Sequence, residues 1–149
     1  MKKLNEKYKI VLTDDDPDDC EIFKSALESL SEHIELIIFH RGHDLLEYLA
    51  SDEELPHLVF LDLNMPLMHG FEVLGAIRTG SRYSNLSVAI YSTSRHQRDV
   101  EEAMVKGANI YIAKPNDYKE LQLTLEKVLS ANWAYHNHAL DKSNFYFTL

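Results

Sequence analysis

Residues 58–63 read LVFLDL, four consecutive apolar residues followed by the carboxylate of Asp62 and one more leucine. A continuous apolar run of this length is typical of a strand that is buried on both faces of a parallel sheet. A buried carboxylate is costly unless it is paired or bound to a cation. The run therefore indicates an α/β fold, with a polar site at the end of this strand.

Short apolar runs of the same kind alternate along the chain with stretches of helical periodicity. The predicted strands cover residues 9–13, 35–39, 58–63, 87–92 and 109–113. Helices are expected to begin at Asp16-Pro17, after Gly42, after Gly70, near residue 95 and near residue 117. Alternation of this kind predicts βα units around a parallel sheet. We therefore predict a doubly wound (βα)5 fold with a five-stranded parallel sheet.

Length and composition limit the classes of partner. The 149 residues suit one domain, which we place at residues 1–130. The net charge is −9, and the chain has no basic stripe of the kind that binds nucleic acid. No segment approaches the roughly 20 apolar residues that span a membrane. We expect neither nucleic acid nor a membrane as a partner.

Residues 131–149 differ in composition from the rest of the chain, and they are too short for a separate output domain. Their aromatic residues include Trp133, Tyr135, Phe145, Tyr146 and Phe147. Such a set rarely stays exposed together, so we expect this extension to pack on its own domain or on a partner, with a homodimer as the favoured use.

The single cysteine, Cys20, cannot form an internal disulfide and fits a reducing cytoplasm.

Polar residues follow the predicted strands at the sheet edge where ligands bind in open parallel sheets. They are Asp14 and Asp15, Asp62, Ser92 and Lys114. Carboxylates that converge repel one another, and Mg²⁺ is the hard cation that best fits such oxygens together with a phosphoryl group. Asp62 can then act as a nucleophile and form an acyl phosphate, while Lys114 and Ser92 bind phosphoryl oxygens.

From Tyr8 to about Leu129 the chain resembles the receiver domains of bacterial two-component response regulators. The motifs that carry the resemblance are Asp14-Asp15, Asp62-Leu63-Asn64-Met65-Pro66, Gly70, Ser92-Thr93 and Lys114-Pro115. The resemblance implies the flavodoxin-like strand order 2-1-3-4-5 and makes Asp62 the phosphoacceptor. It also implies Mg²⁺ bound by Asp14, Asp15, Asp62 and the backbone carbonyl of Asn64.

The resemblance implies three further features. The peptide between Lys114 and Pro115 is expected to be cis. Tyr111 stands at the family's switch-aromatic position and is expected to turn inward when Ser92 moves toward the phosphoryl group. The chain looks most like the small stand-alone regulators that partner phytochrome-type and related hybrid histidine kinases. We therefore expect a signalling protein, not an enzyme, that takes its phosphoryl group from a histidine kinase or phosphotransfer protein and acts on a protein partner or in a phosphorelay.

Two other functions remain open. A haloacid-dehalogenase-like phosphatase would use Asp14 as nucleophile with Asp16 two positions on, which leaves Asp62 and Asn64 unexplained. A degenerate receiver could serve only as a scaffold, although the intact Asp62 and Lys114 count against that.

Two residue assignments have plainer alternatives. Asp18 and Asp19 are expected to be solvated acids at a helix N-terminus. Tyr111 could be an ordinary aromatic residue on the face of a strand.

Overall fold

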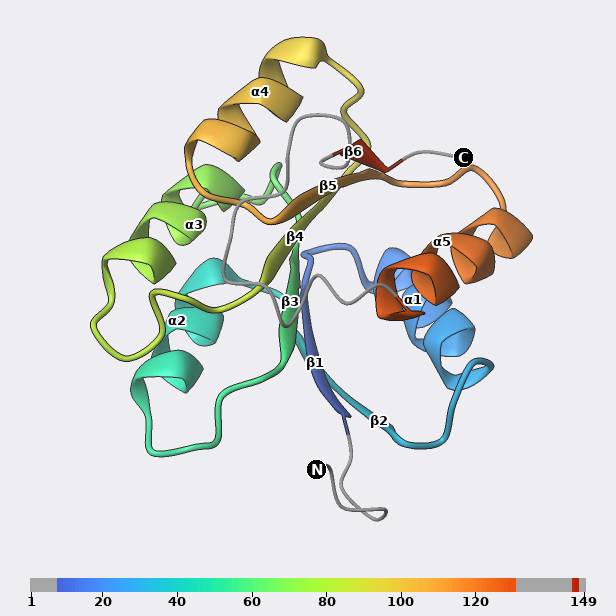
Figure 1. The fold of residues 1–149 in the computed structure, drawn as a ribbon, viewed down its shortest axis with the longest axis horizontal. Helices are drawn as coiled ribbons and strands as arrows, with labels where there is room; N and C mark the ends of the chain where they lie inside the picture. Colours follow the sequence, from blue (N-terminus) through green and yellow to red (C-terminus); the bar gives the residue numbers. More distant parts are fainter. Residues whose placement is uncertain (1–7, 131–145, 148–149) are drawn as a thin grey trace.

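The computed structural model describes residues 8–130 and 146–147. The strands are β1 (Tyr8–Thr13), β2 (Ile34–Phe39), β3 (Leu58–Leu61), β4 (Val88–Ser92), β5 (Ile110–Ala113) and β6 (Tyr146–Phe147). The helices are α1 (Pro17–Glu28), α2 (Gly42–Ala50), α3 (Gly70–Thr79), α4 (Gln97–Val105) and α5 (Tyr118–Ser130). All strand pairs are parallel, and the sheet order is β2-β1-β3-β4-β5-β6 (Figure 1). The predicted order 2-1-3-4-5 is confirmed.

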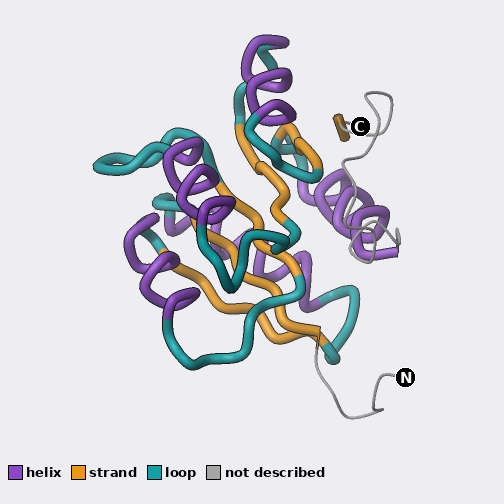
Figure 2. The backbone as a smooth tube through the Cα atoms, turned by 60° about the vertical axis from the view of Figure 1, so that its left-hand side comes forward, coloured by secondary structure: helices purple, strands orange, loops and turns teal. Residues whose placement is uncertain are grey.

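Helices cover both faces of the sheet, so the strands form a middle layer (Figure 2). On the face covered by α1 and α5, Phe23 packs edge-on against Phe60 and Tyr91. On the face covered by α2, α3 and α4, the core includes Leu61 and Tyr111. Successive residues of one strand belong to different faces, as Tyr91 and Ile90 do on β4.

Two helix starts follow from local chemistry. The Asp16 side chain accepts hydrogen bonds from the backbone N–H groups of Asp18 and Asp19, and Pro17 begins α1. Helix α3 begins at Gly70, where a Cβ would clash with the backbone carbonyl oxygen of Asp62. Only glycine permits that approach, so Gly70 allows α3 to pack directly against the loop that carries Asp62.

The structure differs from the sequence prediction most clearly at the end of β3 and in an added strand. Strand β3 ends at Leu61 instead of residue 63, because the chain then turns and the carbonyl of Leu63 accepts a hydrogen bond from the N–H of Gly70. Strand β6 extends the sheet by pairing with β5, where Tyr146 is opposite Tyr111. A strand of two residues carries no periodicity that a sequence could reveal. Trp133, Tyr135 and Phe145 lie outside the described residues.

Among the residues that the structure describes, none of the helices has the length and apolar character needed to cross a bilayer.

Candidate functional site

The structure brings three predicted carboxylates together at one sheet edge. Asp14 and Asp15 follow β1, and Asp62 follows the neighbouring strand β3. One carboxylate oxygen from each lies within 4.8 Å of the others. Oxygen ligands of this kind are what a hard divalent cation prefers. The three side chains therefore fit the Mg²⁺ that the sequence indicated.

Burial makes it costly to keep the carboxylates of this cluster ionised. Asp14 and Asp62 are buried, while Asp15 is half-buried. Burial raises the pKa of Asp62 to about 6; the charge of Lys114 opposes the rise, whereas those of Asp14 and Asp15 add to it. Burial likewise raises the pKa of Asp14, against the hydrogen bond from Lys114. A bound cation would relieve the cost of keeping these groups ionised together.

Lys114 reaches the cluster from the end of β5. Its Nζ lies 2.7 Å from Oδ2 of Asp14, 2.9 Å from Oδ2 of Asp19 and 3.8 Å from Oδ1 of Asp62. Burial alone would lower the pKa of Lys114, but the hydrogen bond to Asp14 and the charges of the nearby carboxylates outweigh it and raise that pKa. The lysine therefore remains charged, and it stands within reach of a group attached to Asp62.

The expected cis peptide between Lys114 and Pro115 is wrong for this structure, since the described residues contain no cis peptide bond. The trans form is favoured by about 0.5–1 kcal/mol even before proline. Lys114 reaches Asp14 from a trans backbone, so aiming the lysine does not require the cis isomer.

Asp19 is a site residue that the sequence analysis missed. Four residues after it, Phe23 is fully buried, so Asp19 lies at the inner edge of α1. Four residues after Asp18, in contrast, Ile22 is 48% exposed. The spacing of the apolar residues in α1 was therefore a usable signal that Asp19 and Asp18 differ.

Ser92, the last residue of β4, and Tyr111, on β5, share a connection through Ser94. The Ser92 hydroxyl accepts a hydrogen bond from the N–H of Ser94 at 3.1 Å, and the Tyr111 hydroxyl donates to the carbonyl of Ser94 at 2.7 Å. The Ser94 hydroxyl donates to the Asp99 carboxylate at 2.5 Å, in the first turn of α4. Tyr111 is fully buried and already points inward. Ser94 thus joins Ser92, β5 and α4, a role that its sequence neighbours do not reveal.

Asn64 lies on the exposed part of the loop after Asp62. Whether its backbone carbonyl is a cation ligand stays a prediction.

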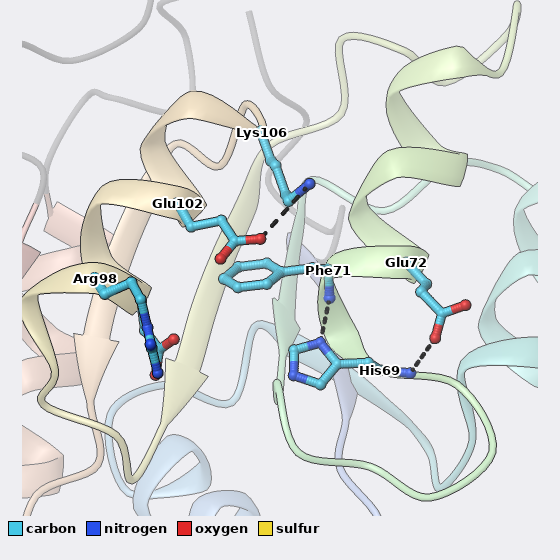
Figure 3. A pocket seen from close by; sticks show the side chains of 7 residues that line it. His69, Phe71, Glu72, Arg98, Glu102 and Lys106 are labelled. Carbon is cyan, nitrogen blue, oxygen red and sulfur yellow. Dashed lines mark hydrogen bonds and ion pairs between the residues drawn. The ribbon is translucent and has the colours of Figure 1, made fainter.

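A hollow of about 590 Å³ lies between α3 and α4. Its lining residues are His69, Phe71, Glu72, Arg98, Asp99, Glu102 and Lys106. Figure 3 shows the Phe71 ring beneath the ion pair of Glu102 and Lys106. None of the site residues expected from the sequence lines this hollow, but Asp99, the hydrogen-bond partner of Ser94, does.

The comparisons with known proteins agree with this geometry. A family model described as response regulator receiver domain matches residues 10–126. Response regulator Rcp1 of Synechocystis sp. is 29% identical over 117 residues, which cover 75% of this chain and 80% of Rcp1. A CheY homolog of Campylobacter jejuni, a chemotaxis protein, is 29% identical over 121 residues, which cover 81% of this chain and 92% of the homolog.

Solved structures give the same result. The Mn²⁺-bound form of Rcp1 is similar with a TM-score of 0.74 and 26% identity, covering 83% of this chain and 92% of that one. The phosphorylated cyanobacterial phytochrome response regulator RcpA is similar with a TM-score of 0.76 and 26% identity, covering 82% and 91%. These relatives confirm the resemblance that the motifs indicated.

Proposed function

Because the chain belongs to the response regulator receiver domain family, we propose that it is a single-domain response regulator whose Asp62 accepts a phosphoryl group from a histidine kinase or phosphotransfer protein. One observation carries the assignment: Asp62 is buried where the Asp14–Asp15 pair and Lys114 converge. The geometry supports a carboxylate nucleophile with a charged partner for the incoming group.

The reaction transfers a phosphoryl group between two side chains. An oxygen of Asp62 forms a bond to phosphorus as the bond from phosphorus to the donor's histidine nitrogen breaks. The donor imidazole, protonated on its other ring nitrogen, takes the electron pair of the broken bond and leaves as the neutral ring. Lys114, 3.8 Å from Asp62, supplies positive charge to a phosphoryl oxygen. Asp14, Asp15, Asp62 and the backbone carbonyl of Asn64 would hold Mg²⁺, which would supply positive charge near the transferred group. Chain and donor together therefore supply every atom of the step.

The proposed readout begins at Ser92. The Ser92 hydroxyl can donate a hydrogen bond to an anionic phosphoryl oxygen on Asp62. A charge-assisted hydrogen bond of this kind contributes roughly 1.5–3 kcal/mol. Movement of Ser92 breaks the hydrogen bond that its hydroxyl accepts from the N–H of Ser94. The carbonyl of Ser94 accepts from Tyr111, and the Ser94 hydroxyl donates to Asp99. The signal would thus reach the surface formed by α4, β5 and α5. Because Tyr111 is already buried, the change passes through its bond to Ser94 and needs no inward turn.

The partners follow from the family and its relatives. Likeness to Rcp1 and to the phytochrome response regulator RcpA supports a phytochrome-type or hybrid kinase as donor, in the cytoplasm. The output is a protein contact or a further phosphotransfer. Residues 131–149 are proposed to serve a homodimer, and the pairing of β6 with β5 supports packing of that extension on a receiver domain.

The decisive experiment is labelling of the full chain with acetyl phosphate and Mg²⁺. A base-labile phosphoryl group should appear on Asp62, and Asp62→Asn or EDTA should abolish it. Labelling of Asp14 would instead favour the haloacid-dehalogenase-like phosphatase, and no labelling would favour the scaffold. Similar yield from Asp62→Asn would refute the assignment.

The readout has its own test. Ser92→Ala should leave Asp62 labelled but reduce the phosphorylation-dependent NMR shifts around Tyr111. Shifts of full size in that variant would exclude the Ser92 hydroxyl as the coupling element.

A further inference from the structure

The ammonium of Lys114 is shared between carboxylates with different surroundings. Asp14 and Asp19 both accept hydrogen bonds from it, at 2.7 Å and 2.9 Å. The Asp14 side chain is 1% exposed, whereas that of Asp19, on the first turn of α1, is 36% exposed. Lys114 itself is 10% exposed and lies over the ring of Tyr91, with its Nζ 5.2 Å from the ring centre. Its position is therefore defined by these contacts and not by solvent.

Asp14 has two possible positive partners. It belongs to the carboxylate cluster with Asp15 and Asp62 that fits a divalent cation, and it is also the carboxylate closest to the Lys114 ammonium. A cation at that cluster and the lysine ammonium are like charges that compete for one carboxylate. Among the described residues, Asp19 contacts Lys114 but is not part of the cluster. It stays available to the lysine when Asp14 binds the cation.

We propose that Asp19 is a positioning residue for Lys114, which it holds beside Asp62 while a divalent cation occupies Asp14. The inference rests on the proposed function, because in that function Lys114 binds an oxygen of the phosphoryl group on Asp62. With Asp19 removed, Lys114 has Asp14 as its remaining hydrogen-bonded carboxylate and competes with the cation for it. Loss of Asp19 should therefore weaken cation binding and free the lysine in the cation-bound protein.

Asp18 provides a matched control. It lies in the same turn of α1, is exposed, and makes its hydrogen bond through its backbone N–H to Asp16. Asp18→Asn removes the same charge as Asp19→Asn and the same favourable interaction with the helix dipole. Asp18→Asn leaves the contact between Asp19 and Lys114 in place. Comparison of the two variants therefore distinguishes the effect of losing that contact from the effect of losing one negative charge.

The test uses the full, unphosphorylated chain and MgCl₂ as the probe. Calorimetric titration of Asp19→Asn should give an affinity for Mg²⁺ lower by about tenfold, the lower end for loss of a group that supports metal ligands. Asp18→Asn should stay within about twofold, since it removes charge alone. Asp19→Glu keeps a carboxylate and should recover most of the affinity. Asp19→Ser should repeat the loss, and it replaces Asp19→Asn if that variant does not fold.

A second measurement reads the lysine directly. At low temperature the Lys114 ammonium should give a protected ¹H–¹⁵N signal in the Mg²⁺-saturated native chain and in Asp18→Asn, but not in Asp19→Asn. Equal weakening of Mg²⁺ binding by both Asn variants, or a retained ammonium signal in Asp19→Asn, would overturn the proposal. Neither measurement involves phosphoryl transfer, so failure of the Asp62 assignment would appear separately, in the labelling experiment.

Discussion

Asp62, directly after β3, faces charged groups, whereas Ser92, at the end of β4, belongs to a chain of hydrogen bonds. The first group consists of Asp14, Asp19 and Lys114, and its contacts are ion pairs. The second consists of Ser92, Ser94, Tyr111 and Asp99, and its contacts join hydroxyls to backbone groups and to one carboxylate. We call them the ionic side and the hydroxyl side.

The two sides respond to different perturbations. Ion pairs depend on pH and on added cations, while hydroxyl contacts depend on geometry and are each worth only about 0.5–1.5 kcal/mol. The ionic side is therefore suited to binding a cation and a phosphoryl group, and the hydroxyl side to passing on a change of shape.

The largest effect is expected from Lys114→Met on the ionic side. The substitution leaves Asp14 buried without its ammonium partner, and breaking a buried pair in this way costs about 3 kcal/mol. Urea unfolding in EDTA should show that loss, and Mg²⁺ should restore part of it. Lys106→Met, at an exposed ion pair with Glu102, is the control and should change stability by less than about 0.5 kcal/mol. Equal effects of the two substitutions would mean that the buried ion pairs of the ionic side are no more stabilising than an exposed ion pair.

A somewhat smaller effect concerns pH. The pKa of Asp62 is raised from 3.8 to about 6, so the folded state favours the neutral carboxyl, and this contribution to stability is present below pH 3.8 and lost as pH rises through about 6. Relative to Asp62→Asn, the native chain in EDTA should lose about 2–3 kcal/mol of stability between pH 4 and 7. Urea unfolding at several pH values measures this. Saturating Mg²⁺ should remove the difference; its persistence would mean that no cation binds beside Asp62.

On the hydroxyl side, Tyr111→Phe should cost about 1 kcal/mol, because it removes the bond to the Ser94 carbonyl and keeps the ring. Acetyl phosphate should still label Asp62 at a similar rate, while phosphorylation-dependent NMR shifts in α4 should shrink. Tyr83→Phe is the control, since the Tyr83 hydroxyl has no hydrogen-bond partner among the described residues. If the phosphorylation-dependent NMR shifts in α4 are unchanged in Tyr111→Phe, the Tyr111 hydroxyl has no part in the readout.

The smallest effect is expected at Thr13, at the end of β1. Its hydroxyl is buried, and within the described part of the chain it has no hydrogen-bond partner. Thr13→Val keeps the shape and removes that unsatisfied group, so thermal unfolding should show a gain of about 0.5–1 kcal/mol. Thr79→Val, where the hydroxyl donates to the carbonyl of Gly75, should give no gain. A destabilised Thr13→Val would imply an unrecognised partner of the hydroxyl in solution.

Sequence patterns predicted the fold well, because its elements carry strong local signals. The Asp16-Pro17 start of α1 appears as expected. The carboxylate cluster was also predictable, because parallel strands bring their carboxyl ends to the same edge.

The contacts that were missed depend on distant residues. Asp19 meets Lys114 across 95 positions, and Ser94 is linked to Tyr111 across 17. No local preference specifies such a pairing; only the folded sheet brings these residues together. Strand β6 is similar, since two residues become a strand only because β5 offers them an edge.

The strand order also bears on how the domain forms as it leaves the ribosome. After β1 and β2 pair, β3 joins the other side of β1, and β4, β5 and β6 then add in turn to the growing edge. No later strand must be inserted between two earlier ones, which suits vectorial folding from the N-terminus. The nascent sheet carries its acidic trio before Lys114 has been translated. Until β5 docks, that half-made domain lacks the internal counter-charge of the finished site, and a cation from the surrounding solution is the partner that can take its place.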